Sequence, residues 1–123
     1  MKTEFASGMT LQQRHAVLDF VRQLRTAKGD RVLKVLLIGS VARGDFASDA
    51  DIDVAVVAKG VDTRFKWDVW DIGAQVSLAH DVILNVHIYS DARWAEMRQN
   101  QNALWQNIER DGIDLVPAAD PAA

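Results

Sequence analysis

Cysteine is absent from the 123-residue sequence, and proline is scarce, with two residues in the final stretch PAADPAA. The absence of cysteine excludes disulfide bonds, thiolate metal sites and a cysteine nucleophile. Hydrophobic residues make up 49% of the chain and charged residues 25%, a composition typical of globular proteins. A chain of this length buries about 65% of its unfolded surface. We therefore expect one domain over residues 1–123, with an ordered core over about 10–116 and a loose C-terminal tail.

Long apolar runs are also missing. Runs such as VLLIG after Lys34 are far too short to span a bilayer, and the start MKTEFASGMT contains no apolar run of signal-peptide length. These two absences predict a cytoplasmic protein with no membrane association.

Basic residues are fewer than acidic ones, and the net charge is −3. This argues against non-specific nucleic-acid binding, because that affinity comes from neutralising phosphates with lysine and arginine. Residues 1–44 carry 8 basic and 3 acidic side chains, whereas residues 45–123 carry 6 and 14. The asymmetry fits a site that holds a phosphate and its metal between a basic and an acidic part, and it fits equally a first helix with a solvated basic face.

The spacing of hydrophobic residues predicts alternating helices and strands. Apolar residues recur at helical spacing over residues 11–28, with Thr10 as the N-cap, and Ser40 is a good N-cap for a short helix. In the helix predicted over residues 63–80 the apolar residues lie on so many sides that more than one face must be covered. Strands are predicted over residues 32–38, 51–58 and 82–90, and further helices around Trp94 and Met97 and over residues 103–111.

The stretch GSVARGDFASDADID, residues 39–53, places four aspartates within nine positions. Alternation along the strand that follows puts Asp51 and Asp53 on one side and the apolar residues on the other. Residues two apart on a strand lie about 6 to 7 Å apart on the same side, so these carboxylates can converge on Mg²⁺. Such a pair on an otherwise buried strand is costly without a cation. Asp45 and Asp49 are interpreted as loop and turn residues, because aspartate is a common turn former.

A phosphate site is predicted just upstream. The free N–H groups of a helix that begins at Gly39 and Ser40 can bind an anion, glycine lets a phosphate approach the backbone, and serine adds a hydroxyl donor. Arg43 would support either the loop or the phosphates. Geometry therefore suggests a metal-bound nucleoside triphosphate between this helix start and the carboxylate strand.

These residues resemble a known signature. Gly39 to Asp45 read GSVARGD and, after five intervening residues, Asp51 to Val54 read DIDV. The pattern looks like that of the DNA polymerase β-like nucleotidyltransferase superfamily. The small size and the ending LWQNIERDGIDL look most similar to its minimal nucleotidyltransferase (MNT) domains, which are often partnered with HEPN-domain proteins as antitoxin and toxin. The resemblance covers about residues 10 to 112.

The resemblance implies an α/β (α+β) nucleotidyltransferase fold, in which a small mixed β-sheet is backed by helices. It implies a two-ion Mg²⁺ site on Asp51 and Asp53 and a nucleoside triphosphate, with ATP as the first candidate, at Gly39 and Ser40. Relatives transfer a nucleoside monophosphate to a hydroxyl and release pyrophosphate, and the antitoxin members modify a tyrosine of the partner toxin.

Two positions depart from the resemblance. The residue before Asp51, usually serine, is Ala50, which removes a hydroxyl donor. The third carboxylate that completes the metal site in the family is expected on the next strand, where this chain has Asn85. Asparagine can offer an amide oxygen to a cation but brings no charge and cannot act as a base. Asp81, the nearest carboxylate, is expected at the entrance of that strand.

Other side chains leave alternatives open. His87 shares a strand face with Asn85, where it could assist a proton transfer or simply be a half-buried, hydrogen-bonded histidine. Trp67 and Trp70 lie on a helix with apolar residues on several sides, which favours a protein contact. That contact could be with a partner or with a second copy of the chain.

The sequence supports two functional hypotheses. The first is a Mg²⁺-dependent nucleotidyltransferase that uses ATP or another nucleoside triphosphate, with a hydroxyl of a HEPN-type toxin as acceptor. The second is an antitoxin-like binding module with the same fold and with weak or absent transfer. Asn85 is the residue that separates the two.

Overall fold

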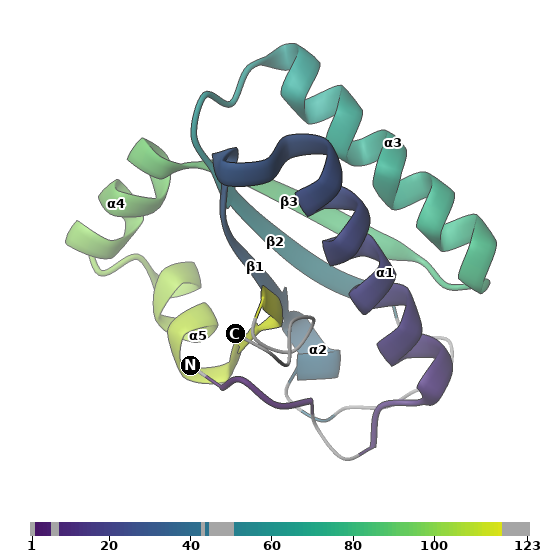
Figure 1. Cartoon of the computed structure of the whole chain (residues 1–123). Helices are drawn as coiled ribbons and strands as arrows, with labels where there is room; N and C mark the ends of the chain where they lie inside the picture. The colour runs from purple at the N-terminus through teal and green to yellow at the C-terminus, as the bar shows by residue number, and fades with distance from the viewer. Residues whose placement is uncertain (1, 6–7, 43, 45–50, 117–123) are drawn as a thin grey trace.

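The computed structural model describes residues 2–5, 8–42, 44 and 51–116 (Figure 1). The predicted loose tail after residue 116 lies outside these residues. Four strands form one sheet in the order β3-β2-β1-β4. Their bounds are Val32–Ile38 (β1), Ile52–Ala58 (β2), Leu84–Ser90 (β3) and Ile113–Asp114 (β4).

The sheet is mixed, as predicted. β1 is antiparallel to β2 and to β4, whereas β2 and β3 run parallel. The α/β (α+β) fold class is therefore confirmed. The short strand β4 was not among the predicted elements, because two residues are too few to show any periodicity.

Five α-helices surround this sheet in the described chain, and most of their bounds agree with the prediction. They are α1 (Leu11–Lys28), α2 (Gly39–Ala42), α3 (Thr63–His80), α4 (Asp91–Gln99) and α5 (Ala103–Asp111), with a 3₁₀ turn η1 (Gly29–Arg31) after α1. A capping box begins α1, in which Thr10 Oγ1 accepts a hydrogen bond from the Gln13 N–H and Gln13 Oε1 accepts one from the Thr10 N–H, both at 3.0 Å. Ser90 caps α4 as predicted.

β3 begins two residues later than predicted. Asp81 ends α3 in the left-handed conformation, with φ at 54°. The N–H of Val82 then donates to the Ser77 carbonyl at 3.1 Å, which belongs to the closing turn of the helix. The strand therefore starts only at Leu84.

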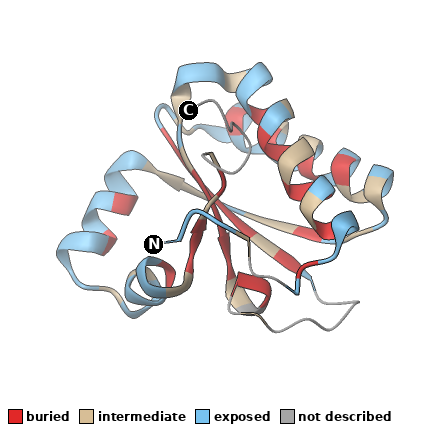
Figure 2. Ribbon diagram, turned by 60° about the horizontal axis from the view of Figure 1, so that its bottom comes forward, coloured by how far each residue is buried: buried red, intermediate tan, exposed pale blue. Residues whose placement is uncertain are grey.

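The two faces of the sheet carry separate apolar clusters. α1 and α3 lie across one face, as Figures 1 and 2 show, and bury it completely around Phe20 and Phe65. α4 and α5 cover part of the opposite face, where Trp94, Met97 and Ile108 pack on β1 and β2. A space remains between this second face and α5, beside the start of β2.

Only one face of α3 is covered by the described part of this chain, so the expectation that more than one face is covered stays a prediction for a partner or a second copy. Phe65, Val69 and Val76 are buried against the sheet, but Trp67 on the outer side of the helix is 64% exposed and Leu78 is 85% exposed. No described helix is long and apolar enough to cross a membrane.

Candidate active site

Two neighbouring parallel strands bring the predicted polar residues together. Asp53 on β2 is the register partner of Asn85 on β3, and Asp51 directly precedes β2. The Asn85 Nδ2 donates a hydrogen bond to Asp51 Oδ2 at 3.1 Å. The position expected to hold the third carboxylate thus lies within hydrogen-bonding distance of the first one. Asp81, as the cap of α3, precedes this strand.

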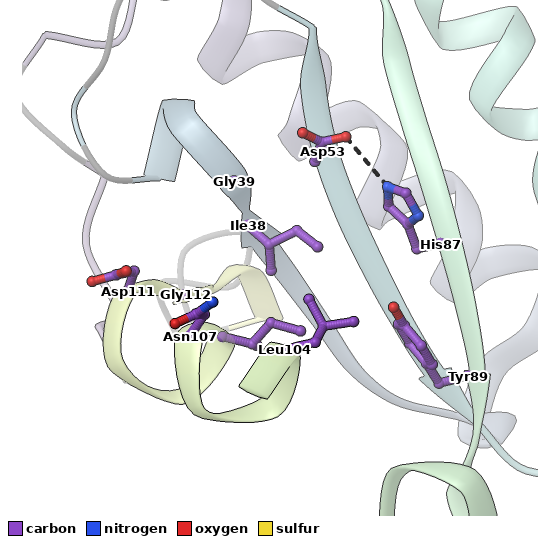
Figure 3. A pocket seen from close by; sticks show the side chains of 10 residues that line it. Ile38, Gly39, Asp53, His87, Tyr89, Leu104, Asn107, Asp111 and Gly112 are labelled. Atoms are coloured by element: carbon purple, nitrogen blue, oxygen red, sulfur yellow. Dashed lines mark hydrogen bonds and ion pairs between the residues drawn. The ribbon is translucent and has the colours of Figure 1, made fainter. Parts of the chain in front are cut away.

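His87 lies one pleat further along the same face of β3. Its Nε2 lies 3.3 Å from Asp53 Oδ1, a contact drawn as the dashed line in Figure 3. The imidazole side chain is 46% exposed and the Asp53 carboxylate 31%. The structure therefore places His87 as a hydrogen-bonded but solvent-accessible partner of Asp53.

Gly39, directly after β1, borders the site. Ile38 pairs with Asp53 across the antiparallel β1–β2 ladder, so the chain leaves β1 directly beside this carboxylate. Gly39 has a φ of 75°, which side-chain-bearing residues rarely adopt. A Cβ built on Gly39 would lie 2.7 Å from Asp53 Oδ2. The backbone and the carboxylate can approach this closely only because the residue is glycine.

The predicted anion site begins where the structure starts α2. This short helix has the bounds Gly39–Ala42. The Ser40 side chain and Arg43 lie outside the described residues, as do Asp45, Asp49 and Ala50. The described part of the site therefore consists of the helix start, the two strand carboxylates and the β3 side chains.

A cavity of about 320 Å³ opens beside Asp53 and His87. Figure 3 shows α5 forming the opposite wall, where Leu104, Asn107 and Asp111 line the space. Its remaining lining residues are Ile38, Gly39, Tyr89, Ile108 and Gly112. An apolar wall with a few polar groups is the usual make-up of a small-molecule site.

Tyr89 contributes a neutral hydroxyl to this cavity. Burial raises the pKa of its phenol above the ordinary value, and the nearby Arg93 guanidinium only partly opposes that effect. The hydroxyl therefore stays protonated at physiological pH and can donate a hydrogen bond to a ligand.

The contribution of α5 is absent from the sequence-based prediction. Leu104, Ile108 and Asp111 follow the i, i+4, i+7 spacing of one helix face, so the sequence shows which side faces inward. It does not show what that side faces, because the return of α5 to the sheet depends on the chain as a whole.

The donor set fits a divalent cation and a polyphosphate. Carboxylate and amide oxygens are suitable ligands for a hard cation, and Gly39 places no side chain of its own against the Asp53 carboxylate. No three His, Asp or Glu side chains among the described residues already stand close enough to enclose a metal ion. Side-chain movement or further ligands beside the two aspartates would therefore have to complete the coordination.

Comparison with known proteins places this site in a family. A sequence model described as "Nucleotidyltransferase domain" matches residues 16–109. A protein of Methanocaldococcus jannaschii named "Putative protein adenylyltransferase" is 31% identical over 81 residues, which cover 66% of this chain and 77% of that protein.

Solved structures share the fold at low identity. A toxin–antitoxin crystal structure with AMP-PNP has a TM-score of 0.54 at 20% identity, covering 80% of this chain and 71% of the other. The tri-AMPylated Shewanella oneidensis HEPN toxin in complex with the MNT antitoxin has a TM-score of 0.50 at 17% identity, covering 83% and 71%. The family match spans well over half of the chain and includes every described residue of the site apart from Asp111 and Gly112 in the cavity wall, so the protein belongs to the nucleotidyltransferase domain family.

Proposed function

We propose that this protein is a Mg²⁺-dependent adenylyltransferase that transfers AMP from ATP to a hydroxyl group of a HEPN-type partner protein. The observation that carries the proposal is the cradle formed by Gly39 and the Asp53 carboxylate, with Asp51 and Asn85 beside it. The protein adenylyltransferase name of the M. jannaschii relative supports adenylyl transfer to protein. Because the proposed substrate is an intracellular nucleotide, the proposed location is the cytoplasm.

Each part of the site would have a defined task. Asp51 and Asp53 would hold the cation, whose charge stabilises the negative charge that develops on the phosphates. The backbone at Gly39 and Ser40, together with Arg43, would bind the triphosphate. The apolar wall of α5 and the Tyr89 hydroxyl would position the nucleoside or the acceptor.

The proposed reaction is an in-line displacement at phosphorus. The acceptor oxygen forms a bond to the α-phosphorus, and the bond from that phosphorus to the oxygen bridging the β-phosphate breaks. Pyrophosphate leaves with the bonding electrons, and the hydroxyl proton passes to water. Positioning and charge supply most of the acceleration in such a transfer.

The proposed partner surface is the outer side of α3. Trp67 and Trp70 form an edge-to-face pair with centroids 5.6 Å apart, and they are 64% and 41% exposed. The Trp70 Nε1 donates to the Val86 carbonyl at 3.2 Å, which anchors the pair to β3 next to the site. Exposed tryptophans are favoured at interface centres, and toxin–antitoxin complexes are among the solved structures that share this fold.

The second candidate function is an antitoxin-like binding module with weak or no transfer. It is favoured by Asn85, which brings no negative charge to the position where the resemblance expects a carboxylate. Both candidates predict a complex with the partner, and only the first predicts a labelled product.

We expect the HEPN-type product of an adjacent gene to become labelled when it is incubated with this protein, α-labelled ATP and Mg²⁺. We also expect Asn85→Asp to raise the initial rate about tenfold, because a charged ligand strengthens cation binding. Autoradiography of the separated proteins and a release assay for pyrophosphate measure both results. A stable complex without label under any divalent ion would establish the binding module instead, and an unchanged rate in Asn85→Asp would contradict the role given to that position.

Trp67→Ser is expected to weaken partner binding at least about tenfold, because an exposed tryptophan in an interface centre contributes about 2 kcal/mol or more. The affinity can be measured by isothermal titration calorimetry with the purified partner. Leu11→Ser is the matched control, since Leu11 is 70% exposed on α1, next to the end of α3 that is remote from Trp67. Equal affinities of Trp67→Ser and the parent protein would show that the partner binds elsewhere.

A further inference from the structure

The chain carries a nitrogen donor where the family resemblance expects only oxygen ligands. Asn85 occupies the position of the third carboxylate, and His87 follows on the same face of β3. The His87 Nε2 and Asp53 Oδ1 lie 3.3 Å apart at the edge of the cavity. Figure 3 shows the imidazole directed toward the Asp53 carboxylate.

The separation of these two atoms suits a shared cation. Adjacent ligands of a six-coordinate ion at about 2.1 Å lie about 3 Å apart, close to the observed nitrogen-to-oxygen distance. Both side chains are partly exposed, so an ion can reach them without opening the core. A histidine that served only to orient Asp53 would give the same hydrogen bond, and the two roles differ in what happens when a metal binds.

The pair formed by Asp51 and Asn85 can complete the set by side-chain rotation. Their contact joins the Asn85 amide nitrogen to a carboxylate oxygen at 3.1 Å. Rotation of the amide by half a turn exchanges its nitrogen for its oxygen, which is a ligand for cations. Asp51 is exposed and precedes the strand, so its carboxylate is free of the core and can turn with it.

We propose that His87 Nε2 is a ligand of the divalent ion held by Asp51 and Asp53, with the Asn85 amide oxygen in place of the missing carboxylate. This inference rests on the proposed function for the metal site at the two aspartates. One imidazole, one amide and two carboxylates form a softer and less charged set than three carboxylates. Imidazole suits transition metals, whereas Mg²⁺ prefers oxygen ligands. The site therefore binds Mn²⁺ more tightly than Mg²⁺, while Mg²⁺ still binds and supports the transfer.

Pulsed electron paramagnetic resonance of the full chain with Mn²⁺ tests the proposal directly. We expect a ¹⁴N coupling to the bound ion that changes to a ¹⁵N coupling when the protein is grown with ¹⁵N-histidine. This result comes from the parent protein and does not depend on the folding of a variant. A Mn²⁺-bound protein that shows no histidine nitrogen coupling overturns the proposal.

Variants then show which histidine supplies the nitrogen ligand and whether it sets the preference for Mn²⁺ over Mg²⁺. His87→Ala is expected to remove the coupling and to weaken Mn²⁺ binding by about tenfold or more, while Mg²⁺ affinity, measured by competition, changes less than about threefold. His15→Ala removes an exposed histidine of α1 and should leave both affinities unchanged. Asn85→Asp should shift the preference toward Mg²⁺. Coupling that persists in His87→Ala overturns the assignment.

The failure of this inference can be told apart from the failure of the proposed function. Mn²⁺ binding that is lost in Asp53→Asn but shows no nitrogen coupling contradicts only the role of His87. Divalent-ion binding that is identical in the parent protein and in Asp53→Asn contradicts both, because the ion is then not held at this site.

Discussion

Asp53→Asn is expected to lower the rate of nucleotidyl transfer by about 10³-fold or more while leaving the fold intact. The substitution removes one of the two charged ligands proposed for the cation. A cation contributes several kcal/mol to stabilising transferred phosphoryl groups, and a loss of about 4 kcal/mol is enough to lower a rate by about 10³-fold. The amide introduced at this position keeps the size of the side chain and can still contact His87. Steady-state transfer assays measure the effect.

Asp19→Asn provides a matched control for this variant. Asp19 also faces a histidine, with its Oδ2 2.8 Å from His80 Nε2, but it lies between α1 and α3 on the other side of the sheet. Hydrogen bonds from Gln23 and His80 hold the pKa of the Asp19 carboxyl below its usual range. The carboxylate therefore stabilises the fold above the pKa of the unfolded chain, and that contribution is lost as the pH falls through the folded value. Asp19→Asn should cost stability at neutral pH and leave the rate per folded molecule unchanged.

Comparing Asp53→Asn with Asp19→Asn shows whether the rate falls because a carboxylate is lost at the site or because any carboxylate is lost. Denaturant unfolding of Asp53→Asn should stay within about 1 kcal/mol of the parent protein, since the carboxylate is partly solvated. Transfer by Asp53→Asn at more than a tenth of the parental rate would show that this carboxylate is not a metal ligand.

Gly39→Ala is the second variant with a large expected effect, a loss of about 10²-fold in rate. The added Cβ would lie 2.7 Å from Asp53 Oδ2, so the carboxylate must move. A displacement of about 1 Å in a catalytic group can lower the rate by about 10²-fold. The positive φ adds a cost of about 1 to 2 kcal/mol to folding for a residue with a side chain. The predicted effect on the rate is therefore larger than the loss of stability alone would produce.

Gly29→Ala tests whether strain by itself explains the loss. Gly29 also has a positive φ, at 52°, but a Cβ there would have no neighbour within 4 Å. We expect a loss of stability in both variants, followed by thermal unfolding, and a loss of rate per folded molecule only in Gly39→Ala. Equal rates in the two variants would contradict the proposed role of the Gly39 backbone in positioning Asp53.

The sequence predicted the pieces of the site more completely than their surroundings. Alternation along β2 is a local property, because successive side chains of a strand point to opposite faces whatever the strand pairs with. The strand pattern alone therefore places Asp51 and Asp53 together on one side. The same rule places Asn85 and His87 on one face of β3.

The contacts between those faces needed the tertiary structure. The 3.3 Å approach of His87 to Asp53 depends on the parallel register that pairs Asp53 with Asn85, and this register joins residues that are distant in the sequence. The sequence also could not predict what covers the outer side of α3. Its apolar residues predict coverage, yet Trp67 is left exposed, since the described chain has no further layer above that helix.

What the sequence determined by itself is the order of helices and strands, the side on which each carboxylate projects, and the glycine that permits a close backbone approach. Each of these follows from the geometry of a few consecutive residues. Only the tertiary structure decided that α5 lines the cavity and that His87 contacts Asp53. Those outcomes depend on which faces of distant elements pack together. Hydrophobic periodicity indicates which face of a helix or strand is buried, but not which element it packs against.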